Sequence, residues 1–355
     1  MRAGQTNDGR DGVTLRAIRQ AGRSAGLTEC GVASCGPSDH GAQLDAWLAR
    51  GAHGAMEWME RTASVRKELR SKWDWATSAM VGVVSYLTEP VERGELHGIA
   101  RHMSRYARGR DYHDVLKARL TRWGDEIERL AGSPVRRVGL VDTSAVLERE
   151  LATRAGLGWF GKNTCLIGPR GDSWRFIGVL LTDLELSGTG PAPQERCGTC
   201  TACLDACPTG AIREPWFVDA TRCISYLTIE LRGPIPREWR PAIGNWLFGC
   251  DVCQEVCPWN RKTPPVDEPG LAVDQAYAQI SLAELAAMDE ATFRESFEGS
   301  PLRRPKRAGM VRNALIVGAN TGDDEVLRVA ARLVDDPDPG VRDAARYALQ
   351  RDDSG

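Results

Sequence analysis

Eight of the eleven cysteines in this chain lie between residues 197 and 257, at spacings that are typical of iron–sulfur ligands. The first group, in residues 197–207, has gaps of two, two and three residues and is followed by Pro208. The second group, in residues 250–257, has gaps of two and three residues and is followed by Pro258. Bacterial two-cluster ferredoxins use this order of gaps, with proline after the last cysteine. The spacing therefore predicts a protein that carries electrons.

The second group lacks the first cysteine of the pattern, and Cys223, between the two groups, can supply the missing ligand. In two-cluster ferredoxins, the cysteine before proline binds the cluster of the other group. We therefore expect two [4Fe-4S] clusters, with eight ligands and none left over. The first predicted set is Cys197, Cys200, Cys203 and Cys257, and the second is Cys207, Cys223, Cys250 and Cys253.

Two other interpretations of the cysteines are weaker. Paired C-x2-C units also bind structural zinc, but zinc sites leave the third cysteine at a two-residue gap and the two Cys-Pro endings unexplained. A disulfide framework is typical of small secreted proteins, whereas this chain is long and its first residues lack the pattern of a secretion signal.

Length and composition place the clusters inside a larger soluble protein. The chain has 355 residues, which is enough for two or three domains. No apolar run approaches the roughly 18 to 20 residues that span a bilayer, and the cytoplasm is the expected location because it keeps thiols reduced. The formal net charge of −2 is nearly balanced, so any surface for nucleic acid has to be a local patch.

The first 186 residues alternate between helical and strand patterns. Hydrophobic spacing predicts helices at residues 14–25, 43–50, 111–130 and 147–155. Apolar runs predict strands at residues 29–34, 79–87, 138–141 and 176–184. Alternation of this kind indicates an α/β layer structure.

A linker rich in glycine and proline, residues 187–193, separates this region from the cysteine groups. Beyond residues 263–265 the pattern is helical to the end, and a V-R-x-A motif at Val311 recurs at Val341. The 30-residue interval and an Asp/Pro-rich turn indicate a HEAT-like helical repeat, although two ordinary helices could share the motif by chance. The predicted domains are residues 1–186 (α/β), 187–265 (ferredoxin-type) and 266–355 (all-α, HEAT-like).

Asp142 is the acid whose position most favours chemistry. It is expected at the C-terminal end of the strand 138–141, where open α/β sheets tend to place ligand sites. The alternative role is a helix N-cap, because Asp is also favoured where a strand turns into a helix. Position alone leaves both roles open.

Taken together, several segments resemble epoxyqueuosine reductase, a family of cobalamin-dependent iron–sulfur enzymes that modify tRNA. The resemblance extends from about residue 50 to the C-terminus and includes the cysteine groups and residues 150–163 (ELATRAGLGWFGKN). The other similar segments are residues 109–116, 141–143, 222–228, 249–253 and 306–314. The resemblance implies that residues 1–186 form a cobalamin-binding catalytic domain.

The resemblance also implies a reaction. This family reduces the epoxide of epoxyqueuosine, at the wobble position of tRNA anticodons, to the cyclopentene of queuosine, which is the last step of queuosine biosynthesis. Two [4Fe-4S] clusters would feed base-off cob(II)alamin to give Co(I), and two electrons and two protons would be consumed. An epoxide oxygen leaves poorly as an alkoxide, so a positioned acid is needed. The resemblance assigns this role of proton donor to Asp142.

Cofactor and RNA contacts follow from the same resemblance. The expected cobalamin contacts are Arg66, Ser104, Asp142, Asn163, Leu166, Ile177, Ser225 and Asp251. The expected tRNA contacts are Arg303, Arg304, Lys306 and Arg307. The expected partners are a tRNA with a GUN anticodon that carries epoxyqueuosine and an external electron donor such as a flavodoxin or ferredoxin, and the chain is expected to be a monomer.

Two alternatives belong to other functional classes. A corrinoid iron–sulfur reductive dehalogenase would share the fold and cluster arrangement, but the missing twin-arginine signal and the C-terminal repeat count against it. A pure electron-transfer protein would use the α/β region only to dock a partner, and it would bind no cobalamin.

Overall fold

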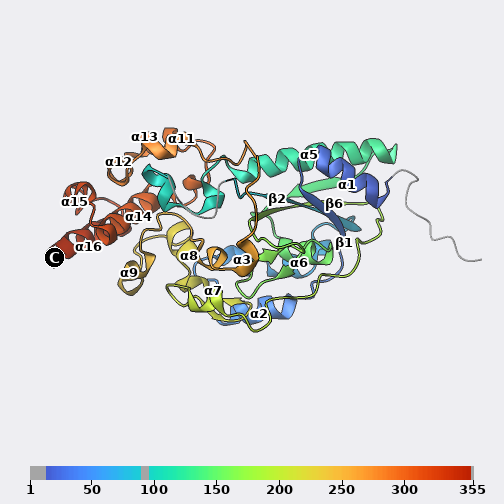
Figure 1. Cartoon of the computed structure of the whole chain (residues 1–355), viewed down its shortest axis with the longest axis horizontal. Helices are drawn as coiled ribbons and strands as arrows, with labels where there is room; N and C mark the ends of the chain where they lie inside the picture. The colour runs from blue at the N-terminus through green and yellow to red at the C-terminus, as the bar shows by residue number, and fades with distance from the viewer. Residues whose placement is uncertain (1–12, 89–95, 353–355) are drawn as a thin grey trace, which may run out of the picture. The chain divides into compact units, whose positions relative to one another are not determined.

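The computed structural model describes residues 13–88 and 96–352, which form two compact units (Figure 1). Among the described residues, unit 1 comprises 13–51, 57–85 and 113–200, and unit 2 comprises 52–56, 86–88, 96–112 and 201–352. Each unit therefore combines distant parts of the chain. No helix within 13–88 or 96–352 is both long enough and apolar enough to cross a membrane.

Unit 1 has the mixed α/β content that the sequence predicts. Its helices are α1 (Leu15–Ser24), α2 (Gly41–Ala49), α3 (Glu57–Arg61), α4 (Ala63–Lys67), α5 (Tyr112–Ala131) and α6 (Glu148–Arg154), with the 3-10 turn η1 (Leu69–Ser71). Its strands are β1 (Glu29–Ser34), β2 (Ser78–Ser85), β3 (Arg137–Leu140), β4 (Trp159–Phe160), β5 (Leu166–Ile167) and β6 (Arg175–Thr182). The helices and strands expected between residues 14 and 184 are all present, with ends that shift by a few residues. The short α3, α4, β4 and β5 were not predicted.

The main sheet of unit 1 has the order β1-β2-β6-β3, and all of its neighbouring strands are antiparallel. This direction corrects one step of the sequence argument. The rule that places ligands at the C-terminal ends of strands holds for open, mostly parallel sheets. In this antiparallel sheet the C-terminal ends of neighbouring strands lie at opposite edges. Asp142 does follow β3 by two residues, but the sheet rule gives no support to its role.

Helices cover both faces of this sheet (Figure 1). On one face, Nε1 of Trp123 in α5 donates to the carbonyl oxygen of Ile18 in α1 at 3.0 Å. On the other face, Leu151 of α6 shares a buried core with Val81 of β2 and Val179 of β6. Because both faces of β2 are covered, its sequence is a continuous apolar run instead of an alternating one.

Glycines in the strands allow α5 to lie close to the sheet. A Cβ at Gly178 of β6 would lie 3.2 Å from a Leu120 methyl carbon, and a Cβ at Gly139 of β3 would lie 3.4 Å from the Leu120 Cβ. The apolar stripe expected on this helix is buried at Leu116, Leu120, Trp123 and Ile127. The stripe and the glycines together position α5, whose first turn carries His113.

Unit 2 contains most of the cysteine region and the helical C-terminal region. Its 3-10 turns are η2 (Gly98–His102), η3 (Arg105–Ala107), η4 (Ala220–Arg222), η5 (Arg237–Trp239), η6 (Pro258–Asn260) and η7 (Pro301–Arg303), and its strands are β7 (Ile212–Glu214) and β8 (Phe217–Val218). Its helices are α7 (Ala202–Asp205), α8 (Ile224–Ile229), α9 (Arg240–Ile243), α10 (Val252–Glu255), α11 (Gln275–Gln279), α12 (Leu282–Ala287), α13 (Glu290–Ser296), α14 (Lys306–Thr321), α15 (Asp324–Ala330) and α16 (Pro339–Asp352).

The two V-R-x-A motifs lie on α14 and α16, which pack against each other. The valines of the motifs, Val311 and Val341, are fully buried. The arginines differ, because Arg312 is buried and Arg342 is only partly buried. Arg312 donates to the carbonyl oxygens of Leu227, Leu231 and Gly233 at 2.7 to 2.9 Å. It therefore joins α14 to the chain around the end of α8.

Replacing this arginine should destabilise the protein strongly. For Arg312→Ala we expect a loss of about 3 kcal/mol in the free energy of unfolding, because main-chain carbonyls lose their charged donor. Arg342→Ala is the matched control: Arg342 donates to the carbonyl oxygens of Asp336 and Pro337 near the surface. Its loss should cost less than about 1 kcal/mol. Denaturant unfolding followed by tryptophan fluorescence measures both, and equal losses would contradict the structural difference.

Candidate functional site

Three of the four cysteines predicted for the second cluster lie close together in unit 2. Burial raises the pKa of the Cys250 thiol, and the charges of Cys223, Asp251 and Cys207 raise this pKa further. Burial also raises the pKa of Cys223, and Cys207 adds to that effect. Thiols affect each other's pKa in this way only when they lie close together, and ligands of one cluster have to lie close together. The fourth member, Cys253, lies in α10, three residues after Cys250.

Main-chain N–H groups point at these sulfurs. Ala211 N donates to Cys207 Sγ at 3.2 Å. The N–H groups of Ser225 and Tyr226 act on Cys223 and lower its pKa against the effect of burial. Hydrogen bonds to sulfur favour the thiolate and tune the potential of a bound cluster. The residues present therefore fit an iron–sulfur cluster.

The cysteines predicted for the first cluster are divided between the units. Cys197 and Cys200 belong to unit 1, where the buried Lys162 donates to the Cys200 carbonyl oxygen at 3.0 Å. Cys203 in α7 and Cys257 after α10 belong to unit 2, and these two helices pack together. Within residues 13–88 and 96–352, no group of three or more His, Cys, Asp or Glu side chains has the arrangement to hold a single metal ion.

Asp142 lies on a turn between β3 and α6 in unit 1. Its φ of 42° is in the left-handed region, which Asp enters more readily than most residues but still at a cost. Its side chain is 61% exposed, and Oδ2 lies 3.2 Å from Nε2 of His113 in α5. The turn thus presents a carboxyl group to the outside, beside an imidazole that can exchange protons.

Arg66 of α4 holds this turn in place. Its guanidinium is buried and donates to the Val146 carbonyl oxygen at 2.8 Å and to Thr62 Oγ1 at 3.0 Å. Burial lowers the pKa of Arg66, while the charges of Glu148 and Asp142 raise it. Arg66 therefore brings a positive charge to two acids of the turn between β3 and α6.

Glu148 is an acid of this site that the sequence did not single out. It is the first residue of α6, its Oε1 is fully buried, and this oxygen has no hydrogen-bond partner in the described part of the chain. Burial and then the charge of Asp142 raise the pKa of Glu148 to about 8, against a hydrogen bond from its own main-chain N–H and the charges of Arg66 and Arg149. From sequence, an acid in the first turn of a helix is explained by the helix dipole, so Glu148 carried no distinct signal.

The other expected cobalamin contacts of unit 1 are mostly buried. Asn163 is buried, and its Oδ1 accepts from Cys165 N at 3.2 Å. Leu166 belongs to the buried core of the sheet, and Ile177 packs against that core. The same core contains Leu140 and Val146, which flank Asp142 in the chain.

The three expected contacts in unit 2 bind their own unit. The Ser104 hydroxyl donates to Asp251 Oδ1, and Arg105 N donates to Asp251 Oδ2 at 2.8 Å. Ser104 and Asp251 are both buried. Ser225 lies against Cys223, where its N–H and hydroxyl act on the thiol. In this structure these residues join segment 96–112 to the cysteine region and support a cluster ligand.

The four basic residues expected at the tRNA differ in their surroundings. Arg303, Arg304 and Lys306 are exposed, and Arg307 is partly buried. Arg304 forms an ion pair with Glu230 at 2.9 Å, and Arg307 forms one with Asp336 at 3.4 Å. Two of the four charges are thus partly offset within unit 2, so the patch is less positive than its sequence indicates.

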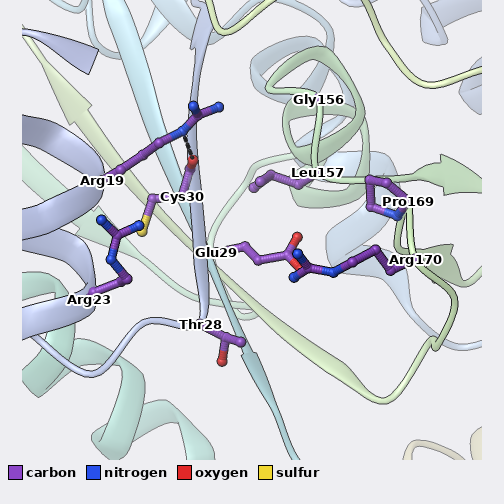
Figure 2. Close-up of a pocket in the computed structure, with 9 residues that line it drawn as sticks. All are labelled: Arg19, Arg23, Thr28, Glu29, Cys30, Gly156, Leu157, Pro169 and Arg170. Atoms are coloured by element: carbon purple, nitrogen blue, oxygen red, sulfur yellow. Dashed lines mark hydrogen bonds and ion pairs between the residues drawn. The ribbon is translucent and has the colours of Figure 1, made fainter. Parts of the chain in front are cut away.

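A separate cavity of about 320 Å³ lies beside the edge strand β1 (Figure 2). Figure 2 shows Arg19 and Arg23 of α1 on one side and Arg170 on the other. Arg170 already pairs with Glu29 at 2.7 Å, and burial raises the pKa of the Cys30 thiol to about 12. None of the expected site residues lines this cavity.

Two family models match the chain. A model described as 4Fe-4S double cluster binding domain matches residues 196–260, and one described as Epoxyqueuosine reductase QueG, DUF1730, matches residues 66–143. The first span contains all eight predicted cluster ligands, which supports iron–sulfur clusters over structural zinc. The second span contains Arg66, Ser104 and Asp142.

Relatives match over almost the whole length. The chain is 40% identical to an epoxyqueuosine reductase of Xanthomonas campestris pv. campestris over 336 residues, 94% of each chain. It is 37% identical to one of Pseudomonas aeruginosa, over 95% of this chain and 94% of the relative. A crystal structure of epoxyqueuosine reductase with a tRNA-Tyr epoxyqueuosine-modified tRNA stem loop has a TM-score of 0.86 and 29% identity, and covers 95% of this chain and 89% of that chain. On this similarity across both units, the chain belongs to the epoxyqueuosine reductase family.

Proposed function

We propose that this chain reduces epoxyqueuosine to queuosine at the wobble position of tRNA. Both carbon–oxygen bonds of the epoxide break, a carbon–carbon double bond forms, and two electrons and two protons convert the oxygen to water. The observation that carries the proposal is the similarity, over 94% of the chain, to epoxyqueuosine reductases. A solved relative that holds an epoxyqueuosine-modified stem loop supports the choice of substrate.

The electrons enter through the cluster region. We assign residues 187–265 to a ferredoxin-type domain in which Cys197, Cys200, Cys203 and Cys257 hold one cluster and Cys207, Cys223, Cys250 and Cys253 hold the other. The N–H groups directed at Cys207 and Cys223 support the second set. An external one-electron donor of the flavodoxin or ferredoxin class would reduce the clusters.

Cobalamin is the second proposed cofactor, and residues 1–186 are the proposed domain for it. Bound cobalamin would supply a low-potential cobalt centre that passes electrons to the substrate. In unit 1, Leu166 and Ile177 offer apolar side chains, and Arg66 and Asn163 offer polar ones. The exposed carboxyl of Asp142, on a turn that Arg66 fixes, suits an acid that donates a proton to the epoxide oxygen.

The C-terminal helices are the proposed tRNA-binding domain, residues 266–355, built as a HEAT-like repeat. The packing of α14 on α16 and the burial of both motif valines support the repeat. Arg303 and Lys306 are exposed cations near its start and can contact phosphates, so binding should weaken as salt rises. The modified base would be turned outward to reach the catalytic domain.

The test is conversion of epoxyqueuosine-containing tRNA by the anaerobically reconstituted protein. We expect nucleoside analysis to find queuosine only when iron, sulfide, cobalamin and a reductant have all been supplied. Omission of cobalamin alone is the control, because the clusters then remain visible in the spectrum while no product forms. Unchanged epoxyqueuosine in a protein whose spectrum shows both cofactors would contradict the proposal.

A further inference from the structure

We propose that Lys162 is the counter-charge of the first cluster and that its buried ammonium group raises the reduction potential of that cluster. The inference rests on the ligand set proposed for this cluster, and it concerns Cys197 and Cys200, the two ligands that belong to unit 1. An iron–sulfur cluster with thiolate ligands carries a net negative charge, which grows when it takes up an electron. Net charge and hydrogen bonds to the sulfurs help to set its potential. A fixed positive charge at a ligand loop therefore favours the reduced form.

A tight turn between β4 and β5 positions Lys162. Gly161 N donates to the Cys165 carbonyl oxygen at 2.9 Å, and Thr164 N donates to the Gly161 carbonyl oxygen at 2.8 Å. Lys162 lies inside this hydrogen-bonded turn. It is only 8% exposed, so its side chain is held within the protein and does not extend into water.

The ammonium group of Lys162 binds the loop that carries the first two predicted ligands. Its Nζ donates to the Gly198 carbonyl oxygen at 2.5 Å and to the Cys200 carbonyl oxygen at 3.0 Å. Within the same loop, Cys200 N donates to the Cys197 carbonyl oxygen at 3.0 Å. One side chain thus fixes the main chain that carries both sulfurs.

No carboxylate pairs with this ammonium group in the part of the chain that the structure describes. The hydrogen bonds that Lys162 donates there go to neutral carbonyl groups. Burial of an ammonium group is costly when no opposite charge compensates for it. A negatively charged cluster on the adjacent loop would supply this compensation.

The turn that carries Lys162 also acts on the sulfur of the first ligand. Burial raises the pKa of the Cys197 thiol, and Glu195 raises it further. The main-chain N–H of Lys162 and the indole of the buried Trp159 lower this pKa. Groups that lower the pKa of a thiol favour the thiolate, which is the form that binds metals. The turn therefore approaches the proposed ligands with its main chain as well as with its charged side chain.

The test is a redox titration of the anaerobically reconstituted protein, followed by electron paramagnetic resonance. Methionine is similar to lysine in length but has no charge, whereas arginine keeps the charge. For Lys162→Met we expect the iron content to stay at about eight atoms per chain. The midpoint potential of one cluster should be lower than in the wild type, and that of the other should be unchanged. In Lys162→Arg the potential should lie closer to the wild-type value than in Lys162→Met.

Two further variants control this comparison. Lys117→Met removes an exposed lysine of α5, whose charge water and salt screen, so neither potential should change. Cys223→Ser removes a proposed ligand of the second cluster and should keep only the first. Lys162→Met made in that background should show the same fall in potential, which assigns the effect to the first cluster.

Lys162→Gln covers the case in which Lys162→Met does not assemble its first cluster. Glutamine has no charge but keeps an N–H donor for the loop carbonyls. A lower potential in this variant supports the counter-charge. Loss of one cluster in both neutral variants, with retention of both clusters in Lys162→Arg, supports it as well, because the positive charge is then needed for the cluster to form.

Three results would overturn the counter-charge. The first is a neutral variant that has both clusters at wild-type potentials. The second is a potential that falls as far in Lys162→Arg as in Lys162→Met. The third is loss of one cluster in all three variants, because the site would then require the shape of lysine and not its charge.

The assumptions behind the inference can fail separately. Cys197→Ser that retains both clusters would refute the ligand set, and the inference with it. The potentials are measured without tRNA. A protein with the expected potentials that leaves epoxyqueuosine unchanged would therefore refute the proposed function alone.

Discussion

Asp142→Asn should retain its clusters and cobalamin while its turnover of epoxyqueuosine falls by a factor of about 10² to 10⁴. Asparagine tolerates the left-handed φ of 42° at least as well as aspartate, so the turn between β3 and α6 should keep its shape. The amide has no acidic proton for the epoxide oxygen, which then has to leave without protonation. Anaerobic single-turnover conversion of modified tRNA measures the loss, and the visible spectrum reports the cofactors in the same sample.

Asp45→Asn is a matched control for this substitution. The Asp45 side chain is 55% exposed and pairs with Lys67 at 2.8 Å, so it resembles Asp142 in exposure and in having a basic partner. We expect its turnover to equal that of the wild type. Asp142→Asn with both cofactors bound and wild-type turnover would show that another group donates the proton.

The elements of unit 1 could be predicted because each has a strong local signal. The stripe of α5 from Leu116 to Ile127 has helical spacing, and the apolar run of β2 is as long as the strand. The arrangement of these elements could not be predicted in the same way. The pairing of β2 with β6 joins residues about 100 positions apart, and a single sequence carries no local signal for such a pair. The antiparallel direction of the sheet was missed for this reason.

The membership of the two units also depends on contacts between distant residues, which a single sequence does not reveal. The sequence predicts continuous domains, but residues 52–56 fold with unit 2, where Ala55 N donates to the Tyr226 hydroxyl at 2.7 Å. This contact depends on residues 171 positions apart. The composition of a linker indicates a boundary along the chain, but it does not reveal which short segments pack with a unit built mainly from distant residues.

The residues of the candidate site also differ in whether the sequence alone could identify them. The cysteines could be found from spacing alone, because cluster ligands have to follow one another closely. Asp142 needed the family resemblance, since its position also fits a helix cap. Glu148 could not be found from sequence, because its raised pKa arises from burial in the folded chain and from the charge of Asp142. Likewise, only the structure shows that Arg304 is paired with Glu230.

Cys223→Ser should remove one of the two clusters and abolish turnover. Each [4Fe-4S] cluster needs four ligands, so iron should fall from about eight to about four atoms per chain, and the path of electrons should be interrupted. Iron and sulfide analysis, with electron paramagnetic resonance of the reduced protein, measures the loss. Cys165→Ser is the control, because this partly buried thiol lies outside both cysteine groups. It should retain both clusters.

Pairs of substitutions distinguish crossed from uncrossed ligand sets. If Cys207 binds the cluster of Cys223, then Cys207→Ser combined with Cys223→Ser loses no more iron than either change alone, and Cys207→Ser combined with Cys203→Ser loses both clusters. If Cys207 instead shares a cluster with Cys203, these two results are exchanged. The influence of Cys207 on the pKa of both Cys223 and Cys250 favours the crossed arrangement. Because non-additivity identifies residues that act on one site, the iron content of these two double variants decides which sulfurs share a cluster.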